Sequence, residues 1–343
     1  MRIAIYGAGA MGTVLGAYLS KAGKSIDLIS RNESHILGLK KNGAHIIGKV
    51  DFVQPVTALL PSEMNGQYDL IFLMTKQLDN RNIVKNLIPF LTDDGVICTM
   101  QNGLPELSVS EIIGPSRTYG CAVSWGATMV GNGIVELTSE PSRKTLTFSL
   151  GRFEGERDAK FEAIHDLLDL MGDVECHANF MGARWAKLLV NSAFSGLSAI
   201  TGGTFGEIAH HRLTRLIGQK IMKECIDLSR KCNIKIEPIQ GKDVVKLLDY
   251  HHRLKQKISF MIIPIAMRKH RSLQSSMLQD LLAGKKCEIE AINGVVCAYG
   301  DKVDFETPYN DMIIKIVHAM ETQQLKPGWD HLKHFDELLN HHS

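Results

Sequence analysis

The sequence predicts an α/β protein whose first half is a mostly parallel sheet and whose second half is helical. Up to about residue 178, short β-rich runs alternate with helical patterns, which is typical of strands joined by crossover helices. Beyond that point strand signals nearly vanish and long apolar-periodic stretches follow. We therefore predict an N-terminal Rossmann-type doubly wound sheet over residues 1–178 and a C-terminal all-helical domain over residues 179–343, a division that the length also favours.

The individual elements follow from local patterns. Strands are predicted at residues 2–6, 25–30, 69–74 and 95–100. Helical periodicity marks residues 11–22, 80–90, 181–200, 205–231, 276–299 and 308–323. Extended segments interrupted by Val130-Gly131-Asn132-Gly133 occupy residues 117–150 and predict hairpins that complete the far side of the sheet.

Composition excludes several classes of function. The 39 basic and 37 acidic residues nearly cancel, so we expect no nucleic-acid partner. The seven cysteines never form a Cys-x-x-Cys pair, which favours reduced thiols in the cytoplasm and predicts no metal site. No apolar run reaches the ~18 residues of a membrane span, so we expect no membrane insertion.

A glycine-rich turn follows the first predicted strand. Its residues are Gly7, Ala8, Gly9, Ala10, Met11 and Gly12, with the spacing Gly-x-Gly-x-x-Gly. In such a turn the first glycine permits a tight bend, the second lets the backbone approach a pyrophosphate, and the third lets the helix pack closely on the strand. The order of strand, turn and helix predicts a dinucleotide site, and a merely flexible glycine loop is the alternative.

The end of the second predicted strand indicates which dinucleotide binds. NAD-specific domains usually place an acidic residue there for the ribose 2′-OH, whereas an arginine accommodates a 2′-phosphate. Here the strand ends Ile29-Ser30-Arg31, and Asp27 precedes that end. We expect NADPH, with Ser30 and Arg31 at the phosphate and Asp27 pointing away. The alternative is that Arg31 is a solvated loop cation.

A polar stripe crosses an otherwise apolar helical segment. Lys187, Asn191 and Ser195 recur at every fourth residue and therefore share one face of the predicted helix. A lysine within so apolar a helix needs a partner or a wet cavity, and a nearby ammonium can stabilise and protonate the alkoxide that forms when hydride reaches a ketone. An ordinary amphipathic helix facing water explains the same spacing.

Further polar residues follow two predicted strands. Lys76 comes after the strand ending near residue 74, and Asn102 after the one ending near residue 100, so both lie at the ligand-binding edge of the sheet. A surface lysine and a turn-forming asparagine are the ordinary alternatives. Residues 275–280 and 287–294 are also mixed, and a helix cap with surface charges accounts for them.

Together these residues resemble the ketopantoate reductase (2-dehydropantoate 2-reductase) family over nearly the whole chain. The segments that carry the resemblance are Gly7 to Gly12, Thr75-Lys76, Gln101-Asn102-Gly103, Gly126-Ala127-Thr128 ahead of Gly133, Trp185-x-Lys187-x-x-x-Asn191, Ser276-Met277-Leu278-Gln279-Asp280, Glu288-Ile289-Glu290-x-x-Asn293-Gly294 and Thr307-Pro308. Several separated motifs agree, which is far more specific than the glycine turn alone.

The resemblance implies roles for individual residues. Lys187 would be the general acid, Glu288 would lie close to the lysine and the cofactor, and Asn191 and Ser276 would bind substrate. Lys76, Asn102 and Ala127 would line the cofactor, and Asn102 would also touch the substrate. The implied reaction is the reduction of 2-dehydropantoate to pantoate by NADPH, a step towards pantothenate and coenzyme A.

The chain departs from the family pattern at three positions. Ser195 stands where a second asparagine is usual, Gly196 stands where proline is frequent, and Phe205 replaces a third substrate-side asparagine. This part of the pocket is then less polar, so a more apolar 2-oxo acid is an alternative substrate for Asn191, Ser195 and Ser276 to bind. A non-catalytic NADPH-binding sensor is a second alternative, and the oligomeric state, a homodimer included, is left open.

Overall fold

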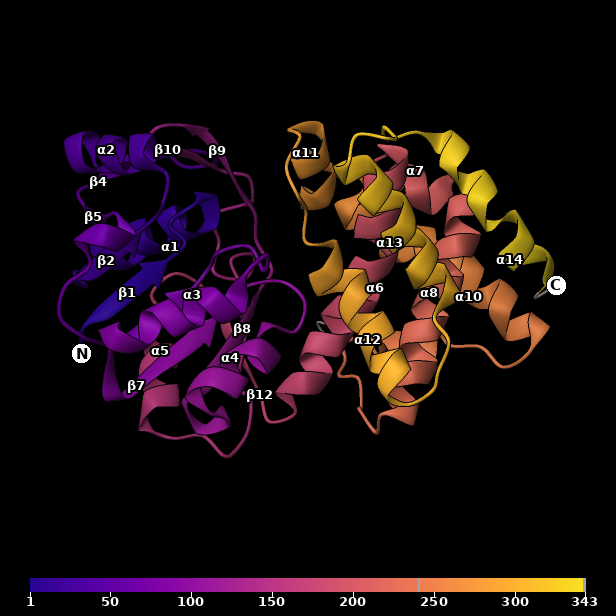
Figure 1. Ribbon diagram of the computed structural model, residues 1–343, viewed down its shortest axis with the longest axis horizontal. Coiled ribbons are helices and arrows are strands. Elements are labelled where there is room, and N and C mark those ends of the chain that lie inside the picture. The colour runs from indigo at the N-terminus through magenta and orange to yellow at the C-terminus, as the bar shows by residue number, and fades with distance from the viewer. Residues whose placement is uncertain (240, 342–343) are drawn as a thin grey trace. The chain divides into compact units, whose positions relative to one another are not determined.

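The computed structural model describes residues 1–239 and 241–341, and the contacts within it divide the chain into two compact units. The first unit is Met1–Phe180 and the second begins at Met181. Strands are concentrated in the first unit, and helices α6 to α14 make up the second (Figure 1). This confirms the predicted fold class, a parallel-sheet α/β domain followed by an all-helical region.

The main sheet of the first unit has eight strands in the order β12-β11-β8-β7-β6-β1-β2-β5. Their bounds are β1 (Ile3–Tyr6), β2 (Ile26–Ile29), β5 (Thr57–Leu59), β6 (Tyr68–Leu73), β7 (Leu91–Thr99), β8 (Thr118–Val123), β11 (Phe148–Arg152) and β12 (Val174–His177). Neighbouring strands are parallel except β11, which is antiparallel to β8. The strand order reverses direction between β1 and β6, and ligands bind at such switch points, outside the carboxyl ends of the strands.

Helices cover both faces of this sheet. The helices of the first unit are α1 (Ala10–Lys21), α2 (Glu33–Asn42), α3 (Asn80–Leu87), α4 (Pro105–Ile113) and α5 (Ala159–Asp169). Alternate residues of β1 enter different cores, since Ile3 and Ile5 pack with α1 and α5 whereas Ala4 packs with α3 and α4. The sheet is therefore doubly wound, as predicted.

A second sheet differs from the sequence-based expectation. Strands β9 (Ala127–Gly131) and β10 (Ile134–Leu137) do not join the main sheet but pair with β3 (Ala44–Gly48) and β4 (Phe52–Gln54), in the order β4-β3-β10-β9. Only β8 and β11 of the predicted hairpin region extend the main sheet. The physical reason is that Val135 and Leu137 of β10 pack into the core formed with α1, and an alternating pattern marks a strand without identifying its partner.

The second unit contains nine α-helices within the described residues. They are α6 (Phe180–Thr201), α7 (Phe205–His210), α8 (Arg212–Lys231), α9 (Val244–Leu248), α10 (Arg253–Ala266), α11 (Ser276–Leu282), α12 (Val295–Lys302), α13 (Pro308–Glu321) and α14 (Asp336–His341), and a π-helical turn, Glu290–Gly294, precedes α12. The helix predicted at residues 205–231 is divided at His211, which caps α8, and the one predicted at residues 276–299 is divided by the loop at Gly284. None of the described helices has the length and apolar character needed to cross a membrane.

Candidate functional site

The glycine turn after β1 is closed by backbone contacts. The N–H groups of Gly7 and Ala8 both donate to the carbonyl of Ile29, at 2.9 and 2.8 Å, which joins the turn to the end of β2. Gly7 has a φ of +106°, a region that favours glycine. A Cβ on Gly12 would stand 2.6 Å from the carbonyl oxygen of Gly7. The first and third glycines are therefore required by the protein's own backbone.

Gly9 is a different case, because nothing in the protein requires a glycine there. Its φ of −82° suits any residue, and an added Cβ would find only the Gly7 oxygen, at 4.0 Å. The helix that follows has no acidic residue in its first turn and no side-chain cap, and the N–H groups of Ala10 and Met11 donate to no acceptor among the described residues. Open space beside a row of N–H groups fits a pyrophosphate.

The polar residues at β2 separate into two groups. Asp27 accepts a hydrogen bond from the Tyr68 hydroxyl at 2.8 Å and forms an ion pair with Arg2 at 3.2 Å. Arg2 and Tyr68 stand at the starts of β1 and β6, so the Asp27 carboxylate lies towards the amino ends of the strands and away from the glycine turn. Ser30 follows β2, where its Oγ accepts the N–H of Asn32 at 3.2 Å.

Arg31 lies beside Ser30 at the carboxyl end of β2 and is exposed. Its charge reaches Tyr6 at the end of β1 and opposes the effect of burial, which raises the pKa of the Tyr6 hydroxyl. Within residues 1–239 and 241–341 no carboxylate forms an ion pair with Arg31. Its guanidinium is therefore available to an external anion at the same end of the sheet as the glycine turn.

The loops after β6 and β7 are fastened to each other. The buried side-chain amides of Gln101 and Asn80 exchange two hydrogen bonds, at 2.7 and 3.0 Å, and the Gln77 amide donates to the carbonyl of Asn102. These contacts hold the segments that carry Lys76 and Asn102 together at the carboxyl ends of β6 and β7. Sequence reasoning missed Asn80, since an asparagine at the start of a helix gives no sign of a partner 21 residues away.

Ala127, at the start of β9, joins the glycine turn through a shared core. It packs against the same cluster as Ala10 and Met11 of α1. A buried histidine, His35, strengthens this link: its Nδ1 accepts the N–H of Gly133 at 3.1 Å, and its Nε2 lies 3.0 Å from Oγ1 of Thr13 on α1. Burial lowers the pKa of His35, which favours the neutral ring that the Gly133 contact requires.

The polar stripe of the second unit lies on α6. Of the residues 184–201, all are buried except Lys187, Val190 and Asn191, which are half-buried, while Ser195 is only 9% exposed. An ordinary amphipathic helix would expose this stripe to water, and α6 does not. Lys187 and Asn191 are therefore the polar side chains of the stripe that stay partly accessible to solvent on a largely buried helix.

Ser276, at the start of α11, and Phe205, at the start of α7, both lie close to α6. The N–H of Ser275 donates to Oγ of Ser198 on α6 at 3.1 Å, and the Ser275 hydroxyl caps α11, so Ser276 is exposed at the first turn of that helix. The ring of Phe205 lies 5.7 Å from that of Phe194, the neighbour of Ser195 in the chain. Ser275 is thus a helix cap, in agreement with the expectation of a cap within residues 275–280.

Shortly after Glu288 in the chain comes Asn293, which belongs to a buried hydrogen-bond network that holds α6 in place. Glu288 is 6% exposed and precedes the π-helical turn that contains Asn293. The Asn293 amide donates to the Ser192 carbonyl on α6 at 3.0 Å and to Oδ1 of Asn310 at 2.9 Å.

The network continues to a buried acid on α8. Asn310 donates its amide to Glu224 at 2.7 Å, and Glu224 also accepts the N–H groups of Tyr309 and Asn310 at the start of α13. Burial raises the pKa of Glu224 to about 7. Sequence reasoning quoted Asn293 only as part of a motif and missed Asn310 and Glu224, whose partners lie far away along the chain.

Comparison with known families covers both units. The model of the ketopantoate reductase PanE/ApbA family matches residues 3–149, and the model of its C-terminal domain matches residues 179–321. The chain belongs to the ketopantoate reductase family. This confirms the resemblance drawn from the separated motifs.

Relatives and solved structures agree along almost the whole chain. A 2-dehydropantoate 2-reductase of Pyrococcus horikoshii is 28% identical, over 94% of this chain and 98% of that relative, and one of Mesorhizobium japonicum is 26% identical over 94% and 99%. A PanE/ApbA family ketopantoate reductase structure from Ralstonia eutropha has a TM-score of 0.79 at 24% identity, covering 94% of this chain and 99% of its own. The ternary structure of D-mandelate dehydrogenase with NADH and anilino(oxo)acetate has a TM-score of 0.80 at 23% identity, with the same coverage. At these identities the two structures support the fold.

Membership makes this ketopantoate reductase homologue an enzyme, a reductase of 2-oxo acids. The interpretation as a non-catalytic sensor is thereby set aside. In the first unit, the turn, Arg31, Lys76 and Asn102 follow the carboxyl ends of β1, β2, β6 and β7, and Ala127 packs on the same core as the turn. In the second unit, Ser275, the neighbour of Ser276, contacts α6, which is the helix that carries the stripe.

Proposed function

We propose that this enzyme reduces 2-dehydropantoate to pantoate, with NADPH as the hydride donor. The observation that carries the proposal is Lys187, a half-buried ammonium on the otherwise enclosed helix α6 of a ketopantoate reductase family member. Relatives such as the Pyrococcus horikoshii protein are named 2-dehydropantoate 2-reductase. The product would serve pantothenate and coenzyme A synthesis.

In this proposal residues 1–178 form the cofactor domain. The N–H groups at the start of α1 and the space beside Gly9 would hold the pyrophosphate, and Ser30 with Arg31 would hold the 2′-phosphate. Lys76, Asn102 and Ala127 would line the rest of the cofactor site, together with Glu288. When bound, the reduced nicotinamide supplies a hydride to the ketone carbon.

Residues 179–343 would form the substrate domain, in which the chain's own side chains move the proton. As the ketone carbon is reduced, charge grows on its oxygen, and the Lys187 ammonium stabilises that charge and transfers a proton to it. This proton transfer completes the new hydroxyl group, and the neutral lysine then regains a proton from solvent. Asn191 and Ser195 would bind the hydroxyl groups and Ser276 the carboxylate, while Glu288 would keep Lys187 charged and in place.

A panel of 2-oxo acids tests the substrate directly. Purified enzyme is given NADPH with 2-dehydropantoate, short aliphatic 2-oxo acids and an aryl 2-oxo acid, and NADPH oxidation is followed. We expect the highest kcat/KM for 2-dehydropantoate. A clearly higher value for any other acid of the panel contradicts this substrate but leaves the reductase reaction in place.

A second candidate substrate is a more apolar 2-oxo acid. It is favoured by the paired rings of Phe194 and Phe205, by Ser195 in place of an amide, and by the likeness to D-mandelate dehydrogenase. Phe205→Asn separates the two candidates. If the ring recognises substrate, this variant should lose about 10- to 100-fold in kcat/KM for the aryl acid and gain for 2-dehydropantoate.

The choice of NADPH depends on Arg31. Arg31→Ala removes the exposed cation at the end of β2, so KM for NADPH should rise about tenfold while KM for NADH stays within twofold, consistent with a lost charge-assisted contact of ~1.5 kcal/mol. Steady-state kinetics with both cofactors measure this. A wild-type enzyme without preference for NADPH would refute the assignment.

A further inference from the structure

Helix α10 carries a row of exposed apolar side chains. Leu254, Ile258, Met261 and Ile265 are 66%, 39%, 61% and 73% exposed, and their spacing places them on one face of the helix. We call these four residues the α10 stripe. Single exposed apolar residues are common on protein surfaces, whereas four in one continuous row form a patch of the kind that often serves as a contact surface.

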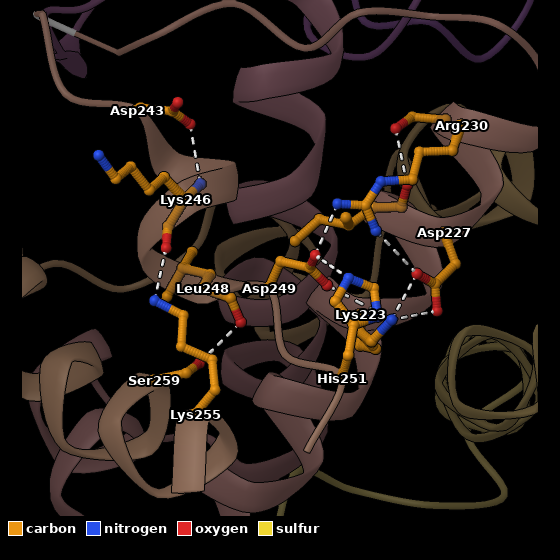
Figure 2. A network of polar contacts seen from close by, with 12 residues as sticks. Lys223, Asp227, Arg230, Asp243, Lys246, Leu248, Asp249, His251, Lys255 and Ser259 are labelled. Carbon is orange, nitrogen blue, oxygen red and sulfur yellow. Dashed lines mark hydrogen bonds and ion pairs between the residues drawn. The ribbon is translucent and has the colours of Figure 1, made fainter. Parts of the chain in front are cut away.

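The opposite face of α10 is firmly held by its own unit. Ile263, half a helical turn from the stripe, is buried, and the Ser259 hydroxyl donates to the Leu248 carbonyl at 2.7 Å. Figure 2 shows this bond and the neighbouring one from Lys255 Nζ to the Lys246 carbonyl, also 2.7 Å. The nearby ion pairs of Asp249 with Lys223 and Arg230 fasten the same segment to α8. The helix is therefore fixed, and the stripe is the side that its own contacts leave uncovered.

The spacing of the stripe has two-fold symmetry. Its intervals are four, three and four residues, which are the alternating intervals of a coiled-coil seam and read the same in both directions along the helix. We propose that the α10 stripe packs against the α10 stripe of a second copy of this chain, antiparallel, about a two-fold axis. In that register Ile258 of each copy lies opposite Met261 of the other, and Leu254 opposite Ile265, so the surface is complementary to itself.

The exposed area suits an interface of modest affinity. The four side chains together expose more than two whole side chains' worth of surface, roughly 400 Å² per copy, while a specific interface buries about 1,000 Å² or more in total. Two stripes supply most of that area. The aliphatic stems of flanking lysines, such as Lys257, cover the rest, because in this register Lys257 lies beside Ile262 of the other copy. We expect dissociation in the micromolar range.

The charge around the stripe decides how the association responds to salt. Residues 250–279 contain six lysines and arginines and no acidic residue. Two copies therefore bring basic flanks together, and screening of their repulsion should strengthen the dimer as salt rises. An anionic lipid surface would behave in the opposite way, since its attraction to the same basic flanks weakens with salt.

The experiment uses two variants of the full chain. Ile258→Lys and Met261→Glu each place an unpaired charge at the proposed axis, so each alone should be monomeric by sedimentation velocity where the wild type is dimeric. Mixed together they should form a heterodimer, because the ammonium introduced into one copy then faces the carboxylate introduced into the other. Leu37→Glu, at a leucine of α2 that is 65% exposed, is the matched control and should leave the wild-type dimer intact.

Several results would overturn the proposal. They are a wild type that stays monomeric up to about 100 μM, far above the expected range, variants that remain dimeric, and two monomeric variants that fail to associate when mixed. Binding of a monomeric wild type to vesicles of anionic phospholipid, lost as salt rises, would assign the stripe to a membrane surface instead. Circular dichroism and thermal unfolding confirm that each variant is folded. The inference does not depend on the substrate, and reductase activity in each variant reports on that separately.

Discussion

The glycine turn of the first unit and helix α6 of the second are built in different ways. The turn is made from backbone groups of β1, α1 and the end of β2, all within 30 residues, and its first and third glycines are required by its own backbone. Helix α6 is held by side chains more than 100 residues later, through Asn293 and the residues behind it. A turn built from backbone groups can be local, whereas a largely buried helix needs support from distant parts of the chain.

Loss of the Asn293 side chain should have the largest effect on stability. Asn293→Ala removes two hydrogen bonds and leaves the buried Asn310 Oδ1 without its donor, so the free energy of unfolding should fall by about 3 kcal/mol. Urea unfolding measures the loss. Asn82→Ala, which removes an exposed amide bond to Asp79, is the control and should change stability by less than ~0.5 kcal/mol. Equal stabilities of the two variants would show that the network does not hold α6.

Glu224 tests the same network through pH. Its pKa is raised to about 7 by burial, so between pH 4.5 and 7 the folded protein retains a proton that the unfolded chain loses. The stability that this group contributes is complete below pH 4.5 and is lost as the pH rises through about 7. We expect the wild type to lose about 3 kcal/mol over that range relative to Glu224→Gln, which cannot titrate. Parallel curves for the two proteins would contradict the burial of a neutral carboxyl.

Two glycines of the turn provide a smaller and sharper contrast. Gly12→Ala places a Cβ 2.6 Å from the Gly7 oxygen and should cost about 1–2 kcal/mol of stability, seen by thermal unfolding. Gly9→Ala meets open space in the protein, so stability should stay within ~0.5 kcal/mol while the Kd for NADPH rises about tenfold or more. If Gly9→Ala binds NADPH normally, the space beside Gly9 does not receive the pyrophosphate.

Much of the first unit could be predicted because its signals are local. The strand, turn and helix around Gly7 to Gly12 follow one another directly, and the positions of β1, β2, β6 and β7 agree with the predicted strands to within four residues. Which sheet β9 and β10 would join could not be predicted. Their alternating pattern suits any sheet, and His35, which links them to α1, looks like a surface histidine in the sequence.

In the second unit, α6 and its stripe were predicted from periodicity, but the support of α6 was not. Asn310 and Glu224 sit in ordinary helical segments, and only the fold brings them to Asn293. Helix α10 was also missed, because its stripe faces outward and Pro264 interrupts the usual helical signal. In both units, local elements could be predicted from the sequence, whereas contacts between distant parts of the chain could not.

Lys187 is the residue on which the proposed reaction depends most directly. Lys187→Ala should lower kcat with 2-dehydropantoate by about 10²-fold or more, the usual contribution of a general acid, while the Kd for NADPH measured by fluorescence stays within about twofold of the wild type. Lys187→Arg keeps the charge but is a poor proton donor, so it should be nearly as slow. A Lys187→Ala enzyme that turns over at close to the wild-type rate would contradict the assignment of the proton to α6.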